Sequence, residues 1–444
     1  MKPSAESGYQ AIIVGGGPAG LAAGIVFARN GIRTLLLERR SLPYAKVCGE
    51  GLMPSGLAAL ARLGLPIAPQ PAGDSSNAQA HTYTAENLSD ANSRPLRGIK
   101  YVDLHTGRCA AAEFAEGPGC GMPRRVLSAR LLNLAQSFAP TLTIQADALC
   151  DTLRRDADGI WTVRLGSREL RTPLLIGADG INSFVRRAAA LDRDHSKRDV
   201  RRWGARWHFP VAPWTDDFVE VQYSPAGVEC YLTPVGDAEI GVAFLWDRAR
   251  FRPGTDGLLD SLLDLFPEVR ARIGETQALP DGGAIGPLLR RVRAVTGRGV
   301  LLLGDAAGYL DAATGEGLSL AFEEALALED TVVPALRSGK NKLASGALRS
   351  YRRRYRSITR NYYRTTPLVL WLGRRASLMR RVVAGLGASP EFFQQMLSIN
   401  MGTRSIFAIG PVAFMRFLWG ALRSARVRPP TVFDARASAP VDRR

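Results

Sequence analysis

Apolar runs of strand length alternate with helical patterns at the start of the chain. Ala11–Val14 and Thr34–Leu37 are short and apolar, and Pro18–Asn30 between them has the pattern of a helix that Gly31 ends. This order predicts a strand, a helix and a second strand, which is the start of a βαβ unit. Leu57–Leu63 predicts a further helix.

Short strands dominate the middle of the chain. Residues 71–97 are rich in Ser, Asn, Asp and Ala, which predicts an irregular crossover with one or two edge strands. From about residue 200 to 284, turns with Pro and Gly separate apolar runs. We expect a hairpin of Ile160–Leu165 and Leu170–Ile176, strands at Trp203–Phe209, Phe218–Tyr223, Glu229–Thr233 and Ile240–Trp246, and helices at Arg124–Ala135 and near Leu258–Phe266.

The last third of the chain returns to a strand and then becomes helical. Val300–Leu303 is an apolar run of strand length, and Leu318–Asp330 predicts the first of several helices. With 444 residues, the chain is long enough for two or three domains with their own cores.

Composition narrows the class of protein. The hydrophobic fraction of 46% is that of an ordinary soluble protein, and the polar residues 1–10 leave no room for a secretory signal. The five cysteines are odd in number and form no C-x-x-C pair, so we expect neither a disulfide framework nor a metal site. A cytoplasmic location fits this cysteine usage.

The net charge of +17 is concentrated at the C-terminus. From Arg337 onward there are 22 Lys and Arg against three acidic residues, so this part carries a net charge of +19 and the rest of the chain about −2. The catalytic part is therefore expected to be nearly neutral, with a strongly basic region after it.

Residues 15–20 (GGGPAG) fit the G-x-G-x-x-G pattern of a dinucleotide-binding turn. Gly15 would allow the tight turn, Gly17 the approach of a pyrophosphate, and Gly20 close packing of the helix. The helix N-terminus attracts phosphate, and Glu38 at the end of the second strand would accept hydrogen bonds from ribose hydroxyls. The alternative is a glycine turn with a purely structural role.

Two further motifs occur later in the chain, and together with the first they point to FAD. Residues 177–180 (GADG) and 304–307 (GDAA), the latter followed by 315–317 (GEG), each come after an apolar run. The three motifs in this order resemble the flavoprotein monooxygenases of the p-hydroxybenzoate hydroxylase type, with their relatives the geranylgeranyl reductases and flavin-dependent halogenases.

The resemblance implies roles for particular residues. Asp305 would bind the ribityl chain, although it could instead only cap a helix. The helix that follows residues 315–317 would direct its N-terminus at the flavin N1–C2 edge. Arg124 would reach the pyrophosphate, and Arg125 is an equally good donor by chemistry. The residues expected to bind FAD are Gly15, Gly17, Pro18, Ala19, Gly20, Glu38, Arg39, Arg124, Asp179, Gly180, Asp305, Gly315, Gly317 and Leu318.

The segment Pro43–Gly51 (PYAKVCGEG) is similar to the P-x-x-x-x-C-G-G-G stretch of geranylgeranyl reductases, with Glu50 in place of a Gly. The resemblance places Cys48 beside the isoalloxazine ring. Cys48 could be a small apolar residue packed at the ring, a redox thiol or a core cysteine, and we favour the first. Lys46 could attract an anionic substrate or the flavin, or be a solvated surface residue. These two are the only catalytic candidates.

Other patterns are absent or carry no chemistry. The halogenase signature W-x-W-x-I-P does not occur, since Trp203 and Trp207 have a different spacing, so halogenation is disfavoured. Trp203, Ala205, Trp207 and Phe209 would share one strand face, as core or as the lining of a substrate cavity. His208 lies on the other face, where a structural or solvated role is expected. A second G-x-G-x-x-G for NAD(P)H is also missing, as it is in the resembled monooxygenases.

The basic C-terminal region allows several interpretations. Helix surface in an Arg-rich chain is the first, and nucleic-acid binding is not expected beside an FAD enzyme. Ile406–Leu422 is apolar except for Arg416 and could lie on an anionic membrane, because a central Arg and an internal Gly-Pro disfavour a spanning helix. A cationic face could instead bind an acidic carrier protein, or the segment could be a buried helix that caps the substrate cavity.

These observations predict an α/β fold with a Rossmann-like three-layer FAD-binding domain (1–75, 116–198 and 285–336). An inserted antiparallel substrate domain (76–115 and 199–284) and a basic helical region (337–444) would complete it. We expect an FAD-dependent monooxygenase, reduced by NAD(P)H, that hydroxylates or epoxidises an apolar small molecule. The alternatives are a reductase of isoprenoid or lipid C=C bonds and a non-catalytic flavin-binding subunit.

Overall fold

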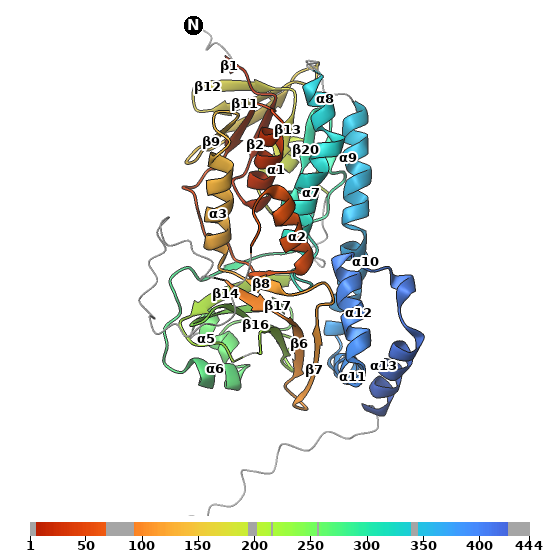
Figure 1. Cartoon of the computed structure of the whole chain (residues 1–444). Coiled ribbons are helices and arrows are strands. Elements are labelled where there is room, and N and C mark those ends of the chain that lie inside the picture. The colour runs from red at the N-terminus through yellow and green to blue at the C-terminus, as the bar shows by residue number, and fades with distance from the viewer. Residues whose placement is uncertain are drawn as a thin grey trace, which may run out of the picture.

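Figure 1 shows the computed structural model of the chain, in which two sheet-containing parts are stacked and helices line one side. The structure describes residues 6–67, 93–193, 202–214, 216–254, 257–338 and 345–424. Most of the crossover expected at 71–97 lies outside the described residues.

A six-stranded sheet forms the centre of the first part. Its order is β19-β20-β13-β2-β3-β9, and all neighbours are parallel except β19 and β20. The strands are β2 (Ala11–Val14), β3 (Thr34–Leu37), β9 (Leu142–Gln145), β13 (Leu175–Gly177), β19 (Thr296–Gly297) and β20 (Val300–Leu302). Helices α1 (Pro18–Arg29), α2 (Pro54–Leu63), α3 (Arg124–Gln136) and α7 (Gly317–Thr331) belong to the same part (Figure 1).

A smaller four-stranded sheet shares the same core, which completes the predicted three-layer arrangement. Its order is β1-β12-β11-β10, and Trp161, Val163 and Leu170 from this sheet belong to the cluster that contains the central strands. The strands are β1 (Glu6–Ser7), β10 (Thr152–Arg155), β11 (Trp161–Leu165) and β12 (Arg168–Thr172), and α4 (Phe184–Ala188) follows β13.

The expected strand Leu170–Ile176 is divided between two sheets. Its first half belongs to β12, which pairs with β11 as the hairpin predicts, and its second half is β13 of the central sheet. Pro173 lies between them and has no N–H to donate to a strand ladder, so the apolar run cannot continue as one strand.

The second part is built on a seven-stranded sheet of order β18-β14-β17-β16-β15-β6-β7. Only β15 and β6 pair in parallel, so strands from about residue 100 and from after residue 200 join in one sheet. The strands are β6 (Gly98–Asp103), β7 (Arg108–Glu113), β14 (Arg202–Phe209), β15 (Phe218–Tyr223), β16 (Glu229–Gly236), β17 (Glu239–Asp247) and β18 (Gly283–Ile285); a small sheet of β4 (Gly51–Leu52), β8 (Gly119–Gly121) and β5 (Arg94–Leu96) lies nearby.

Helices cover both faces of the seven-stranded sheet. On one face, α5 (Leu258–Leu263) and α6 (Pro267–Ile273) pack on Phe244, in place of the single helix expected near Leu258–Phe266. Pro267 starts the second helix, because proline suits a first helical turn. The predicted face of Ala205 and Phe209 lies in this core.

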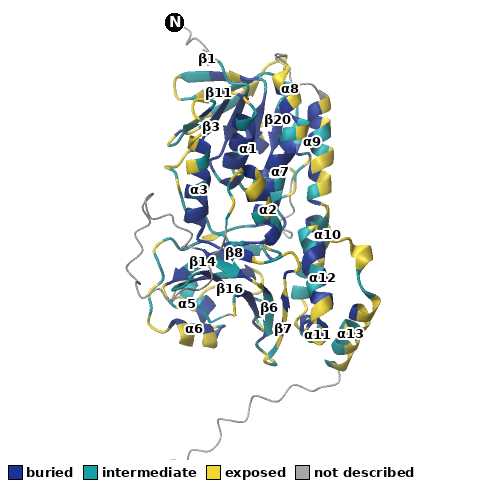
Figure 2. Cartoon of the chain, in the orientation of Figure 1, coloured by how far each residue is buried: buried dark blue, intermediate teal, exposed yellow. Residues whose placement is uncertain are grey.

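The C-terminal region is helical and consists of α8 (Val333–Arg337), α9 (Ser345–Ile358), α10 (Arg360–Gly373), α11 (Ala376–Ala388), α12 (Pro390–Met401) and α13 (Pro411–Arg423). Helices α8 and α9 pack against α7 of the first part, whereas α11 and α12 cover the other face of the seven-stranded sheet. Residues of α11 and α12 form one core with Val219 and Val221 of the sheet. Tyr351 and Tyr355, which alternate with arginines in the sequence, are buried. The alternative of a buried C-terminal helix is wrong, because most of α13 is exposed (Figure 2). None of the described helices is long and apolar enough to cross a membrane.

Candidate flavin site

The three glycine-containing motifs follow the carboxyl ends of adjacent parallel strands. β2, β13 and β20 are neighbours, so the residues after them meet at one edge of the sheet. A Cβ built on Gly15 would lie 2.4 Å from the carbonyl oxygen of Ala178, and one built on Gly304 would lie 3.0 Å from Cβ of Ala19. The structure therefore brings the first motif into contact with both of the others.

The glycines of the first motif have different surroundings. Gly15 has a φ of +113°, which favours glycine. A Cβ on Gly20 would lie 1.8 Å from the carbonyl oxygen of Gly15, so a larger residue would prevent α1 from packing on the turn. A Cβ on Gly17 would have only the hydroxyl oxygen of Tyr44 nearby, at 3.5 Å. Space beside the start of α1, where Pro18 is the first residue, fits a phosphate group.

Glu38 is buried at the end of β3, where the sequence places a ribose ligand. Its carboxylate accepts hydrogen bonds from the N–H groups of Gly16, at 2.7 Å, and Arg40, at 3.1 Å. The hydroxyl of Tyr44 lies 3.5 Å away, and burial followed by the charge of Glu38 raises the pKa of Tyr44 to about 12. Arg39, also predicted to bind FAD, is exposed. Tyr44 lies at an unspecified position of the Pro43–Gly51 stretch and was not among the predicted site residues.

Lys46 and Asp305 form an ion pair in which Nζ lies 2.5 Å from Oδ2. A Cβ on Gly180 would lie 3.9 Å from the same Nζ, so Lys46 lies where the second and third motifs meet. Burial by itself would raise the pKa of Asp305, but the charges of Lys46 and Arg124 hold this pKa below its ordinary value. Asp305 is therefore a partly buried anion whose negative charge is stabilised by two cations.

Arg124 is the more suitable of two adjacent arginines for binding a pyrophosphate. It is buried, and its Nε and Nη1 have no hydrogen-bond partner within the described ranges. Its charge partly offsets the raised pKa of Tyr44 and contributes to the lowered pKa of Asp305, so it acts on both groups. Arg125, in contrast, lies 3.9 Å from a carboxylate oxygen of Asp281. A buried guanidinium with unused donors fits a phosphate ligand.

Asp179 has a structural partner that the motif did not reveal. Its carboxylate accepts hydrogen bonds from the N–H groups of Phe184, at 2.6 Å, and Val185, at 3.1 Å, and from the hydroxyl of Ser183. Asp179 thereby stabilises the start of α4, and Gly180 takes a φ of +78° that favours glycine. The contact of Asp179 with a pyrophosphate stays a prediction.

The third motif ends at the N-terminus of α7. Gly315 has a φ of +69°, α7 begins at Gly317, and Leu318 is buried behind it. Asp305 and Gly317 line the same small cavity of about 20 Å³, so both halves of this motif lie together. Burial raises the pKa of Glu316 to about 8, although Asn400 donates a hydrogen bond to its carboxylate at 3.1 Å.

The segment with Cys48 is held in place by a buried cluster of charges. Glu50 accepts a hydrogen bond from the N–H of Arg124 at 2.6 Å, contacts Nε2 of His208 and lies 3.4 Å from Arg206. The Nδ1 atom of His208 lies 2.7 Å from the carboxylate of Glu239. Burial by itself would lower the pKa of His208, but the carboxylates of Glu50 and Glu239 raise this pKa to about 9. His208 is therefore a buried cation that connects β14 to the Cys48 segment.

The alternation of Arg206 and His208 on the polar face of β14 was the sequence signal for this cluster. Their common partner Glu50 could not be found from that alternation, because it precedes them by more than 150 residues. Cys48 itself is half-buried at the edge of the first core, and its Sγ accepts a hydrogen bond from the N–H of Glu50 at 3.5 Å. This burial fits the preferred interpretation of Cys48 as a small packed residue.

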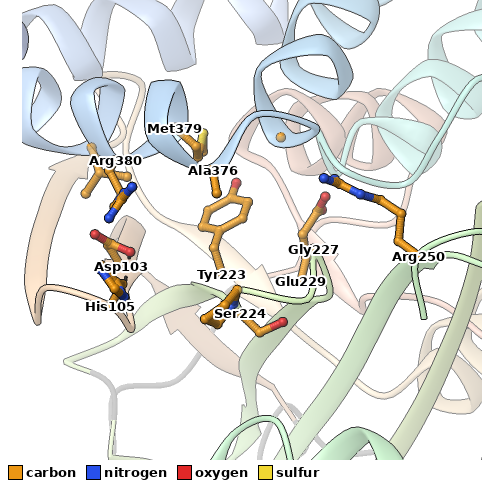
Figure 3. Close-up of a pocket in the computed structure, with 13 residues that line it drawn as sticks. Asp103, His105, Tyr223, Ser224, Gly227, Glu229, Arg250, Ala376, Met379 and Arg380 are labelled. Atoms are coloured by element: carbon orange, nitrogen blue, oxygen red, sulfur yellow. Dashed lines mark hydrogen bonds between the residues drawn. The ribbon is translucent and has the colours of Figure 1, made fainter. Parts of the chain in front are cut away.

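A second cavity, of about 310 Å³, lies between the seven-stranded sheet and α10–α11. In Figure 3 the ring of Tyr223 points from the sheet toward the helix that carries Ala376 and Met379. Glu229 also lines this cavity, and burial raises its pKa while nearby Arg202 opposes the change. None of its lining residues was predicted to bind FAD.

Ion pairs connect this cavity to the third motif. Arg202 lies 3.1 Å from Glu229 and donates two hydrogen bonds to Asp311, at 3.0 and 3.1 Å. Asp311 belongs to the loop between Asp305 and Gly315. Ion pairs through Glu229, Arg202 and Asp311 therefore connect the wall of the cavity to the predicted flavin-binding loop.

The residues present fit FAD. A glycine turn with free space, a buried carboxylate at the end of β3, a buried arginine with unused donors and two helix N-termini meet at one sheet edge. The cofactor is larger than the small cavity at the third motif, and the fit rests on these donors and acceptors rather than on the volume of that cavity.

Comparison with known proteins agrees with this assignment. The family described as "FAD binding domain" matches residues 8–364. The chain is 26% identical over 352 residues to a menaquinone reductase of Mycobacterium tuberculosis, covering 72% of this chain and 75% of that one. It is 24% identical over 367 residues to a digeranylgeranylglycerophospholipid reductase of Methanosarcina acetivorans, covering 79% and 81%.

The fold is also similar to that of solved flavoenzymes. The crystal structure of the halogenase PltM superposes with a TM-score of 0.70 and 16% identity, covering 94% of this chain and 91% of that one. At this identity the likeness shows the fold and carries no information on the reaction.

Proposed function

The chain belongs to the FAD binding domain family and is an FAD-dependent oxidoreductase; from that premise we propose that it reduces a carbon–carbon double bond in an isoprenoid or other lipid chain. This proposal ranks reduction above the monooxygenation favoured by the sequence. The relatives matched along most of the chain are named as reductases, of menaquinone and of a geranylgeranyl lipid.

The position of the Pro43–Gly51 segment carries this proposal. It is the segment by which the sequence resembles geranylgeranyl reductases, and it lies against the predicted FAD-binding residues. Lys46 contacts Asp305, and Glu50 accepts a hydrogen bond from the N–H of Arg124. The segment that carries the resemblance to the reductases therefore lies beside the predicted flavin site, which supports the proposal.

The chain itself would bind, orient and shield the reactants. Bound and reduced FAD supplies a hydride equivalent to one carbon of the double bond, while a proton adds to the other carbon. Arg124 would hold the pyrophosphate, Glu38 the ribose and Asp305 the ribityl chain. The cavity lined by Tyr223, Met379 and Val383 offers apolar surface for part of a lipid substrate.

NAD(P)H is the proposed source of the two electrons, as the resemblance to the flavoprotein monooxygenases implies. The sequence has no second G-x-G-x-x-G, so the nicotinamide would bind only transiently, as in those enzymes. Monooxygenation stays as the competing reaction, since it needs the same cofactor and the same reductant and differs in consuming oxygen. The products distinguish the two reactions, because reduction adds two hydrogen atoms and monooxygenation adds one oxygen atom.

The test uses the purified yellow holoenzyme with a polyisoprenoid quinone and a geranylgeranyl lipid as probes. Under anaerobic conditions, with dithionite as the electron source, we expect the geranylgeranyl lipid to gain two hydrogen atoms. The quinone should gain two hydrogen atoms in its side chain, measured by mass spectrometry after its head group has been reoxidised in air, because dithionite alone also reduces the head group. Dithionite makes this result independent of the choice of nicotinamide. A product that appears only in air and has gained an oxygen atom would overturn the proposal in favour of monooxygenation.

A further inference from the structure

The C-terminal helix α13 has apolar residues on two sides. Toward α11, Ala413 is buried, and a Cβ on Gly420 would lie 2.4 Å from Cβ of Ala388, so the two helices pack closely. A helix on the surface of a soluble protein normally carries polar residues on its outer side. On α13 the outer residues Val412, Met415, Trp419 and Leu422 are apolar instead, and each is at least 60% exposed.

The turn before α13 extends this surface. Phe407, in the short 3₁₀ turn Ile406–Ala408, is 96% exposed, and Ile406 beside it is 53% exposed. Side chains this apolar are rarely grouped on a surface without a partner. We call Ile406, Phe407, Val412, Met415, Trp419 and Leu422 the outer apolar surface; Figure 2 shows α13 largely exposed at the edge of the molecule.

Arginines are frequent in the sequence that forms this surface. The sequence from 392 to 433 contains five Arg and no Asp or Glu. At helical spacing, Arg416 and Arg423 lie along one border of the apolar stripe, and the guanidinium of Arg423 lies over the Trp419 ring at 4.3 Å. Apolar side chains bordered by arginines match the boundary between lipid tails and anionic headgroups.

We propose that α13 and the turn from Ile406 bind this protein to an anionic lipid bilayer, with the outer apolar surface inserted at the headgroup boundary. Two other binding partners would fit the outer apolar surface less well. A second copy of the chain would bring like-charged Arg416 and Arg423 side chains together around a two-fold axis. An acidic protein would bind through the arginines, and this would not account for the exposed aromatic ring of Phe407.

The position of α13 connects this surface to the cavity described above. α11 packs against α13 on one side and lines the cavity with Ala376, Met379 and Val383 on the other. A bilayer bound at α13 would therefore lie one helix away from the cavity. This inference goes beyond the proposed function and does not depend on it, since binding to lipid requires no turnover.

The test is sedimentation of the full-length, FAD-containing protein with phosphatidylcholine vesicles, with and without phosphatidylglycerol. We expect binding to the anionic vesicles and weaker binding to the neutral ones. The pair Phe407→Ser and Trp419→Ser should weaken binding by about tenfold or more. Arg416→Gln and Arg423→Gln should each weaken only the binding to anionic vesicles, by about fivefold.

A matched control is Leu149→Ser, because Leu149 is 62% exposed and follows β9, a strand of the part of the molecule opposite α13 in Figure 1. This variant should bind as the wild type does, and retained FAD absorbance reports that each variant is folded. Absence of vesicle binding by the wild type overturns the proposal, as does equal binding by the Phe407→Ser/Trp419→Ser protein. If the wild type forms a dimer, the double variant is monomeric and neither protein binds vesicles, the outer apolar surface serves self-association instead. Vesicle binding without reductase activity would keep this inference and overturn the proposed function.

Discussion

Arg124 and Arg125 have the same chemistry and differ only in their surroundings. Arg124 is buried with two nitrogen atoms that have no partner in the described chain, whereas Arg125 faces Asp281. We predict that Arg124→Met lowers FAD affinity by about ten- to a hundredfold, since charge-assisted hydrogen bonds to the pyrophosphate are lost. Quenching of flavin fluorescence during titration of the apoprotein measures this affinity.

Arg125→Met is the control for that substitution. It should change FAD affinity by less than about threefold, because its charge lies next to a carboxylate rather than in the predicted phosphate site. Equal losses in both variants would show that the general positive charge of this helix, and not the buried guanidinium, holds the cofactor.

Residues whose roles depend on local backbone were predictable, and residues with distant partners were not. Gly15, Gly20 and Glu38 follow from the turn and the strand that carry them, and the structure places them accordingly. The partner of Lys46 is 259 residues away, and that of Glu50 is 158 residues away. Nothing in the local sequence selects one distant partner among the many residues of opposite charge.

Two glycines at the turn between β2 and α1 are expected to have different roles, Gly20 in packing and Gly17 in cofactor binding. A Cβ at position 20 would lie 1.8 Å from a backbone oxygen, whereas a Cβ at position 17 would have only the Tyr44 hydroxyl nearby. We predict that Gly20→Ala destabilises the protein by about 3 kcal/mol or more through overpacking. Gly17→Ala should keep the fold and lower FAD affinity, because the methyl group occupies the space beside the helix N-terminus.

Thermal unfolding of the two apoproteins and FAD titration separate these effects. The unfolding midpoint of Gly17→Ala should stay close to that of the wild type, while Gly20→Ala should unfold at a clearly lower temperature or fail to accumulate. A Gly17→Ala protein that unfolds early but binds FAD normally would contradict the assignment.

Glu316, directly before α7, and Glu329, near the end of α7, have pKa shifts of opposite direction. Burial raises the pKa of Glu316 from 4.5 in the unfolded state to about 8 in the folded state. The folded state therefore binds this proton more tightly than the unfolded state, and the free energy of unfolding falls as pH rises from 4.5 through 8. Glu316→Gln keeps a carbonyl for Asn400 and removes this cost. We predict that the variant is as stable as the wild type near pH 4.5 and more stable by a few kcal/mol near pH 8.

Glu329, near the end of α7, is a control with a pKa shift of the opposite direction. Burial opposes ionisation, but Asn30 and Arg29 lower the pKa of Glu329, so its stabilisation is present above pH 4.5 and lost in acid. Glu329→Gln should therefore be less stable than the wild type at neutral pH and equal to it in acid. Urea unfolding of all three proteins across this pH range measures both differences, and parallel curves would contradict both assignments.

Strands and helices were predicted well where one apolar run forms one element. β2, β3, β14 and α1 agree with their predicted ranges to within a residue or two. One error arises where a proline divides a predicted run, at Pro173 between β12 and β13. Helix α6, which begins at Pro267 just after the predicted range of α5, was not predicted. Apolar periodicity shows that a segment is buried, and it does not show to which sheet the segment belongs.

The arrangement of the whole molecule depended on family resemblance. No pattern in residues 98–113 shows that β6 and β7 join strands from beyond residue 200. The outward apolar side of α13 was equally hidden, because periodicity identifies an amphipathic or apolar helix without showing what covers it. The segment Ile406–Leu422 was recognised as unusual, but only its exposure distinguishes a surface helix from a buried one.

The link between the two sheet-containing parts should respond to pH. His208 on β14 is held between Glu239 and Glu50, and these carboxylates raise its pKa to about 9 against the effect of burial. A histidine whose pKa is about 9 in the folded state and 6.5 in the unfolded state contributes stability that is complete below pH 6.5. This stability is lost as pH rises through 9.

We therefore predict that His208→Gln lowers the free energy of unfolding by about 3 kcal/mol near pH 6 and by much less near pH 10. The Cys48 segment depends on the same contact through Glu50, so the variant should also release FAD faster at the lower pH, which stopped-flow fluorescence measures. His105→Gln, at an exposed histidine, should change neither quantity. A loss of stability that is the same at both pH values would mean that His208 acts by packing alone, and the Glu50–His208 contact would not be an ionic link between the two parts.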